Sequence, residues 1–134
     1  MTNASAAVET QDRVTVLVVN DRHEILEALE RFLNRFEHVR VVGLAQGTEE
    51  AIDLAVLSRP RVVLCDFIRE NSRTLERVRL LRIELPQSCI IVMSYDDDDS
   101  GREAALQAGA SLFISKFKLG DEFIPVLERC LPLN

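Results

Sequence analysis

The chain has 134 residues, a length that suits one domain, and 47% of them are hydrophobic, enough for an ordinary buried core. Its formal net charge of -6 argues against non-specific binding to nucleic acid, which needs a basic face. No apolar run is long enough to span a membrane, and the N-terminus has no apolar signal core.

Three cysteines, Cys65, Cys89 and Cys130, lie in or beside apolar runs. An odd number of cysteines in such positions is typical of packed, reduced thiols and not of a disulfide framework. We therefore expect all three to be reduced and the protein to be cytoplasmic.

Short β-branched runs alternate with stretches of helical periodicity along the whole chain after a polar lead-in. Residues 1–12 are polar and aperiodic, which predicts a flexible segment in front of a single domain over 13–134. The predicted strands are Val14–Val19, Val39–Leu44, Arg61–Cys65, Cys89–Met93 and Ser111–Ser115. The predicted helices cover about 22–36, 48–58, 73–84, 100–109 and 121–131.

Two helix boundaries rest on particular residues. Thr48 is predicted to cap the second helix with its side chain. Pro125 is tolerated in the last helix only within its first turn, so this helix is predicted to begin near Asp121 or Glu122.

Strict alternation of strand and helix predicts an α/β fold with a parallel sheet covered by helices on both faces. The first, third and fourth strands are almost wholly apolar and suit the sheet centre, whereas the second suits an edge. A flavodoxin-like (βα)5 doubly wound sheet of order 2-1-3-4-5 fits this pattern, with a crevice between strands one and three.

Polar residues follow four of these strands at their carboxyl ends, the edge where open α/β sheets build their sites. They are Asn20 and Asp21 after strand one, Asp66 after strand three, Ser94 after strand four and Lys116 after strand five. The chain has 14 arginines but only two lysines, Lys116 and Lys118, so a lysine at this edge is less easily accidental.

These residue types suit a divalent cation and a phosphoryl group. Two carboxylates and an amide offer the hard oxygen ligands that Mg²⁺ prefers. The Asp66 carboxylate can act as a nucleophile and form an aspartyl phosphate. Ser94 could donate a hydrogen bond to a phosphoryl oxygen, and Lys116 could pair with another as a point charge.

The motifs Val18-Val19-Asn20-Asp21, Val63-Leu64-Cys65-Asp66, Val92-Met93-Ser94 and Gly109 to Lys116 resemble those of response-regulator receiver domains of two-component signalling. The resemblance covers residues 13–131. Val41-Val42-Gly43 followed by Glu49-Glu50-Ala51 is similar to the NarL/LuxR-like subfamily, which is usually fused to a DNA-binding domain.

The resemblance implies a role for each site residue. It implies that Asp66 accepts a phosphoryl group from a sensor histidine kinase, and that Asp21 and Asp66 ligate Mg²⁺. It implies that Asn20 ligates through water and that the carbonyl of Ile68 is a further ligand. Ser94 and Phe113 would form the switch pair that acts on the face of the fourth helix, fifth strand and fifth helix.

The sequence departs from the family pattern at several positions. Asn20 stands where the family usually has aspartate, so we expect weaker Mg²⁺ binding, but not its loss. Phe113 lacks the hydroxyl of a tyrosine, and Phe117 replaces a common proline. Tyr95 stands where a small residue is usual and could crowd phosphoryl access or block water.

We expect a phosphorylation-controlled switch and not an enzyme in the ordinary sense. It would serve as a stand-alone regulator or as part of a longer transcription factor, with a possible homodimer and no direct contact of this domain with nucleic acid or membrane. The alternative is a degenerate receiver that acts as a phosphate-independent interaction module. An aspartate-nucleophile phosphatase ranks low, because that class has Asp-x-Asp on its strand and here Phe67-Ile68 follows Asp66. A flavodoxin-like electron carrier is also disfavoured, because this chain lacks the phosphate-binding loop that such a carrier has after its first strand.

Overall fold

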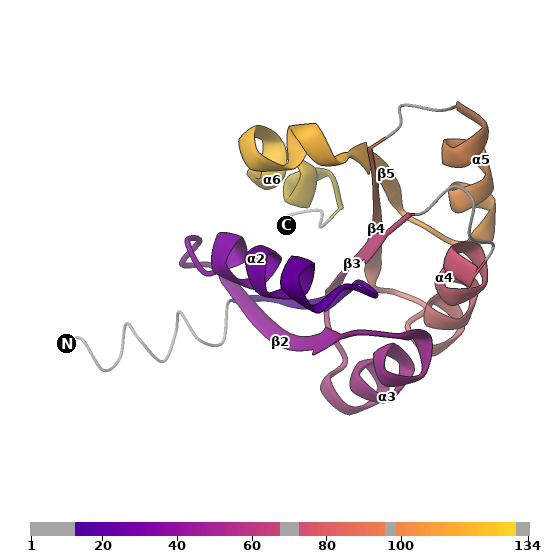
Figure 1. The fold of residues 1–134 in the computed structure, drawn as a ribbon, viewed down its shortest axis with the longest axis horizontal. Helices are drawn as coiled ribbons and strands as arrows, with labels where there is room; N and C mark the ends of the chain where they lie inside the picture. Colours follow the sequence, from indigo (N-terminus) through magenta and orange to yellow (C-terminus); the bar gives the residue numbers. More distant parts are fainter. Residues whose placement is uncertain (1–12, 68–72, 96–98, 131–134) are drawn as a thin grey trace.

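A computed structural model describes residues 13–67, 73–95 and 99–130 of the chain. Strands and helices alternate strictly along it (Figure 1). The strands are β1 (Val14–Val19), β2 (Val39–Ala45), β3 (Val62–Asp66), β4 (Cys89–Ser94) and β5 (Leu112–Ser115). The helices are α2 (His23–Leu33), α3 (Thr48–Ser58), α4 (Arg73–Glu84), α5 (Asp99–Ala108) and α6 (Lys116–Cys130).

The five strands form one parallel sheet of order β2-β1-β3-β4-β5, which confirms the predicted fold class and topology. β3 and β4 are buried along their whole length, as expected for central strands of a parallel sheet. β2 forms one edge, as its weaker apolar pattern predicted.

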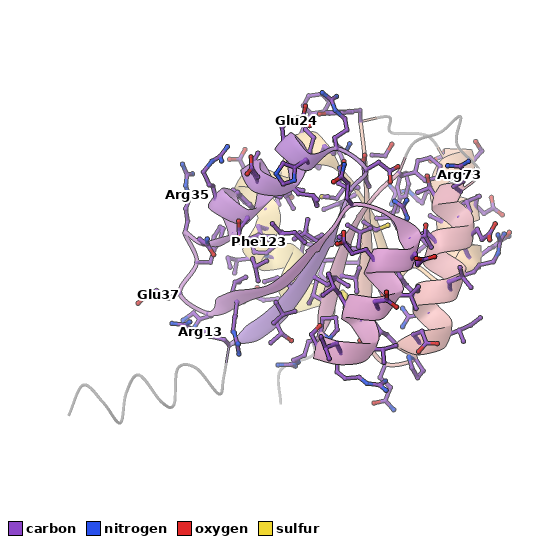
Figure 2. The ribbon with its side chains drawn as sticks, turned by 60° about the horizontal axis from the view of Figure 1, so that its bottom comes forward. Arg13, Glu24, Arg35, Glu37, Arg73 and Phe123 are labelled. Carbon is purple, nitrogen blue, oxygen red and sulfur yellow. A yellow bond between two sulfur atoms is a disulfide. The ribbon has the colours of Figure 1, made fainter. Side chains whose placement is uncertain are left out.

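Helices cover both faces of the sheet, so the molecule has two apolar cores. α2 and α6 lie on one face, and α3, α4 and α5 lie on the other (Figure 1). Alternate residues of each central strand point to opposite faces: Leu64 joins the core under α2 and α6, whereas Val63 joins the other. Phe123 of α6 points into the interior (Figure 2), where its ring contacts those of Phe32 and Phe36.

The last helix begins earlier than predicted. α6 follows β5 directly at Lys116, and Pro125 therefore lies inside the helix and not in its first turn. Burial of Leu119, Phe123, Val126 and Leu127 against the sheet outweighs the helix-breaking tendency of the proline, since tertiary packing provides most helical stability in proteins.

One expectation about the cysteines is wrong. Cys89 at the start of β4 and Cys130 at the end of α6 are joined as a disulfide, with Cα atoms 5.7 Å apart. They meet because α6 runs back along the sheet from β5, which brings its end to the amino end of β4. Cys65 remains a free, buried thiol, as expected.

Candidate functional site

The candidate site lies at the carboxyl end of the sheet, where the chain leaves β1 for α2 on one face and β3 for α4 on the other. β1 and β3 are neighbours, and their divergent connections open the crevice that α/β sheets use for ligands. The predicted residues Asn20, Asp21, Asp66, Ser94 and Lys116 all lie at this edge.

Asp66 and Lys116 form an ion pair at the centre of the site. Oδ1 of Asp66, the last residue of β3, contacts Nζ of Lys116, the first residue of α6. The two side chains are only 10% and 18% exposed, respectively. Asp66 Oδ1 is buried and accepts no hydrogen bond of ordinary geometry beside this ionic contact. The lysine balances the charge of this buried carboxylate, which keeps lone pairs available to an electrophile.

Tyr95 covers the lysine from the solvent side. Nζ of Lys116 lies 4.1 Å from the centre of the Tyr95 ring, within the range of a cation–π contact. The Phe117 ring lies 5.6 Å from that of Tyr95, and both aromatic rings are largely exposed. Lys116 Nζ therefore has two partners, the Tyr95 ring and the Asp66 carboxylate.

Asn20 is buried, and its side chain closes the turn that leads into α2. Its Oδ1 accepts a hydrogen bond of 2.9 Å from the backbone N–H of Arg22. The backbone N–H of Asn20 donates to the carbonyl of Ala45. The amide oxygen that was expected to face a metal-bound water is thus already engaged with the backbone.

Asp21 is bound to an arginine that no motif of the sequence singles out. Nη2 of Arg77, on α4, donates a hydrogen bond of 2.8 Å to Oδ1 of Asp21. Nε of Arg77 donates to Oγ1 of Thr48 at 2.9 Å, so this hydroxyl serves the arginine and makes no cap bond to α3. The predicted capping role of the Thr48 side chain is therefore wrong.

A signal for Arg77 exists in the sequence. Thr74, Arg77, Val78 and Leu81 recur at the spacing of one helix face, and all four are buried. An arginine within an apolar stripe is rare unless it has a partner, because burying an unpaired charge is costly. That placement predicts a carboxylate near the inner face of α4.

The free thiol of Cys65 is buried beside the charged residues of the site. Burial raises the pKa of its thiol to about 12, and Asp66 and Asp21 act in the same direction while Arg77 acts against it. The thiol therefore stays protonated and serves as packing, with no role as a nucleophile.

Ser94 and Phe113, the expected switch pair, end up on neighbouring strands. Ser94 ends β4 and is buried. Phe113 points inward from β5, and its ring packs edge-on against that of Phe67 with centres 5.6 Å apart. Arg102 of α5 lies over the Phe113 ring at 5.3 Å and donates a hydrogen bond to its carbonyl at 3.0 Å. Phe113 is thus fixed in an inward position.

As arranged, the described residues do not fit a divalent cation. Oδ1 of Asp21 is bound by Arg77, and Asn20 Oδ1 accepts a backbone hydrogen bond, while the charge of Asp66 is already balanced by Lys116. Within 13–67, 73–95 and 99–130 no group of three or more histidine, cysteine, aspartate and glutamate side chains could hold a metal ion. The carbonyl of Ile68, expected as a further ligand, lies outside the described residues.

The family model for the response regulator receiver domain matches residues 16–124, which is most of the chain. The chain belongs to the response-regulator receiver family. Response regulators are signalling proteins of two-component systems, in which receiver domains partner with histidine kinases.

Similar receiver domains occur in transcription regulators. The chain is 26% identical to the transcriptional regulatory protein MctR of Rhizobium johnstonii over 116 residues, covering 87% of this chain and 54% of that protein. It is 31% identical to the response regulator GacA of Pseudomonas aeruginosa over 116 residues, again covering 87% and 54%. The chain therefore spans about half the length of these curated relatives.

Solved receiver structures share the fold. The signal receiver domain of the NarL regulator from Mycobacterium tuberculosis matches with a TM-score of 0.76 and 28% identity, over 89% of this chain and 96% of that one. The response regulator domain of Thermotoga maritima CheB gives a TM-score of 0.78 at 22% identity, over 91% and 98%. The NarL match confirms the predicted likeness to NarL/LuxR-like regulators.

The comparisons give no support to the alternative of a degenerate receiver.

Across the described part of the receiver, no helix is both long and apolar enough to cross a membrane.

Proposed function

We propose that this receiver accepts a phosphoryl group on Asp66 from a sensor histidine kinase. The observation that carries the proposal is the buried Asp66 carboxylate at the end of β3, paired with Lys116, the first residue of α6. A buried carboxylate with one cationic partner at the ligand-binding edge of an α/β sheet suits a nucleophile and not a structural ion pair.

In the proposed reaction an oxygen of Asp66 attacks the donor's phosphorus. A new P–O bond forms as the donor's P–N bond breaks, and the imidazole leaves with the electron pair and takes up a proton. Lys116 then pairs with a phosphoryl oxygen, and the Ser94 hydroxyl donates a hydrogen bond to another. Catalysis consists of positioning and charge neutralisation by these side chains.

The proposed output face comprises α5, β5 and α6, the fourth helix, fifth strand and fifth helix in chain order. Ser94 would move toward the phosphoryl group. Phe113 would then shift its position, and this shift would change its contacts with Arg102 of α5. Leu106 and Ile124 give this face exposed apolar area for a second copy or an output domain. Residues 13–134 would form the receiver unit of such a regulator.

The test is intact mass after incubation with acetyl phosphate, whose P–O bond replaces the kinase P–N bond. We expect one phosphoryl group on the natural chain and none on Asp66→Asn. Asp53→Asn, which removes an exposed aspartate of α3, is the matched control and should be modified like the natural chain. An adduct on Asp66→Asn, or none on a folded natural chain, would contradict the proposal.

A further inference from the structure

Arg77 is a buried cation that the proposed phosphorylation does not use. Its side chain is only 6% exposed, although Arg77 lies on α4, a helix that also carries exposed residues. Arginine is almost never this buried without a specific partner, and a carboxylate hydrogen bond is the partner that stabilises it most. Its partner is Asp21, the residue from which direct Mg²⁺ ligation is expected.

The network around Arg77 is built from three separate elements. Arg77 comes from α4, Thr48 opens α3, and Asp21 follows β1. Asp21 is also held through its backbone, because Nε2 of Gln46 donates a hydrogen bond of 3.1 Å to its carbonyl. The guanidinium therefore binds an aspartate that is already fixed in place.

Among the site residues that the structure describes, the charges balance without a metal ion. Asp21 and Asp66 contribute two negative charges, and Arg77 and Lys116 contribute two positive ones through direct contacts. Asn20 adds no charge. A divalent cation at Asp21 would therefore find no excess negative charge among these residues and would compete with the Arg77 guanidinium for the same carboxylate.

We propose that Arg77 is the resident counter-charge of Asp21 in place of a divalent cation, so that phosphoryl acceptance on Asp66 has little dependence on Mg²⁺. The part that concerns phosphorylation rests on the proposed function, whereas the part that concerns cation binding does not. Arg77 is a positioning residue, since it acts through Asp21 and contacts no reacting atom in this structure.

A pocket of about 420 Å³ beside Asp21 fits this assignment. Its lining consists of Asp21, Gly47, Thr48, Arg73, Glu76 and Arg77. Arg73, at the first turn of α4 (Figure 2), adds a second guanidinium-bearing side chain to this lining. The two arginines balance the two carboxylates of the lining, Asp21 and Glu76, so the pocket has no excess negative charge to attract a divalent cation.

The first experiment titrates Mg²⁺ into the full chain and follows intrinsic fluorescence. Tyr95 is the sole tyrosine and the chain has no tryptophan, so the signal comes from the ring that lies over Lys116. We expect a weak response in the natural chain and on the order of tenfold tighter Mg²⁺ binding in Arg77→Gln, which frees Asp21 and removes a positive charge. Arg79→Gln is the matched control, because Arg79 is an exposed arginine of the same helix, and it should bind Mg²⁺ like the natural chain.

The titration separates this role from a merely structural one. If Arg77 only braces α3, α4 and the turn after β1, Arg77→Gln loses stability while its Mg²⁺ affinity equals that of the natural chain, and the proposal is overturned. The natural chain supplies a further readout that needs no variant. The NMR signal of the Arg77 Nε–H should keep its position as Mg²⁺ is added; its loss or displacement at the Mg²⁺ concentration that saturates Tyr95 would overturn the proposal.

The phosphorylation arm compares acetyl phosphate labelling with Mg²⁺ and with EDTA. We expect similar labelling rates for the natural chain in both conditions and a clear stimulation by Mg²⁺ in Arg77→Gln. Labelling of the natural chain that requires Mg²⁺ would refute the inference while leaving Asp66 as the acceptor. No labelling in any condition would refute the proposed function, and the Mg²⁺ titration would still decide the role of Arg77.

Discussion

At the scale of single residues, Gly109 shows how one position fixes a helix end. It follows α5 with a φ of +124°, in the region that L side chains rarely adopt. A Cβ at this position would come 2.9 Å from Cβ of Arg82, on the neighbouring helix α4. The residue therefore needs to be glycine for both conformation and space.

Gly109→Ala should lower the free energy of unfolding by roughly 1–3 kcal/mol, because the backbone is strained and Arg82 must shift. Gly120→Ala offers the opposite case, since Gly120 lies inside α6 with no atom within 4 Å of an added Cβ. It should raise the free energy of unfolding by roughly 0.5–1 kcal/mol. Urea unfolding of both variants checks the pair, and equal effects would contradict this reading.

At the scale of elements, one arginine ties the ends of several of them together. Nε of Arg82 donates to the carbonyl of Gly109 at 2.9 Å, and Nη1 donates to the carbonyl of Ser88 at 2.7 Å. Nη2 donates to Oγ of Ser111 at 3.0 Å. These bonds join the end of α4 to the end of α5 and to the chain that enters β4 and β5.

Arg82→Gln should lower the free energy of unfolding by about 1–3 kcal/mol, because several acceptors lose their charged donor at once. Arg79→Gln, an exposed change on the same helix, should have an effect within about 0.5 kcal/mol. Thermal or urea unfolding measures both. A variant at Arg82 as stable as the one at Arg79 would show that water replaces the guanidinium without loss.

Pro125 lies inside α6, where a proline disfavours the helix. It is exposed, so its ring contributes little packing, and it cannot donate the helical hydrogen bond to the carbonyl of Asp121.

Pro125→Ala should raise the free energy of unfolding by roughly 1–2 kcal/mol, the helix gain less the loss of chain stiffness in the unfolded state. Pro86→Ala is the control, since Pro86 follows α4 in a turn and only the unfolded-state effect applies there. Calorimetry of both variants decides the matter, and a drop in Tm for Pro125→Ala would count against it.

At the scale of the whole molecule, the disulfide closes the fold across its sheet. Cys89 and Cys130 are 41 residues apart in sequence and join the start of β4 to the end of the last described helix. Together with the ring cluster of Phe32, Phe36 and Phe123, the bond holds α6 against the same face that α2 covers.

Alkylation of the unfolded chain without reductant should modify Cys65 alone, and reduction beforehand should allow modification of all three cysteines. Reduction should also lower the free energy of unfolding by about 2–4 kcal/mol, as expected for a loop of this length. In the folded protein Cys65 should resist alkylation at neutral pH because burial raises the pKa of its thiol to about 12. Three alkylations before reduction would show that Cys89 and Cys130 are thiols.

Strand and helix order, sheet topology and the residues gathered at the site follow from the sequence. Apolar periodicity is a local property, and parallel strands separated by helices have few ways to pair. The bounds of α4 agree with the prediction of 73–84, because Pro86 and an apolar stripe define them locally. The start of α6 was missed, because the packing of Leu119 and Phe123 overrides the local signal of Pro125.

The sequence by itself determined that Asp66, Lys116 and Asp21 would meet at one edge, since that edge is where every strand of such a sheet ends. Only the tertiary structure decided what they contact. The pairing of Arg77 with Asp21, of Tyr95 with Lys116 and of Cys89 with Cys130 joins residues from different elements. Such contacts depend on how helices are seated on the sheet, which no local pattern of residues specifies.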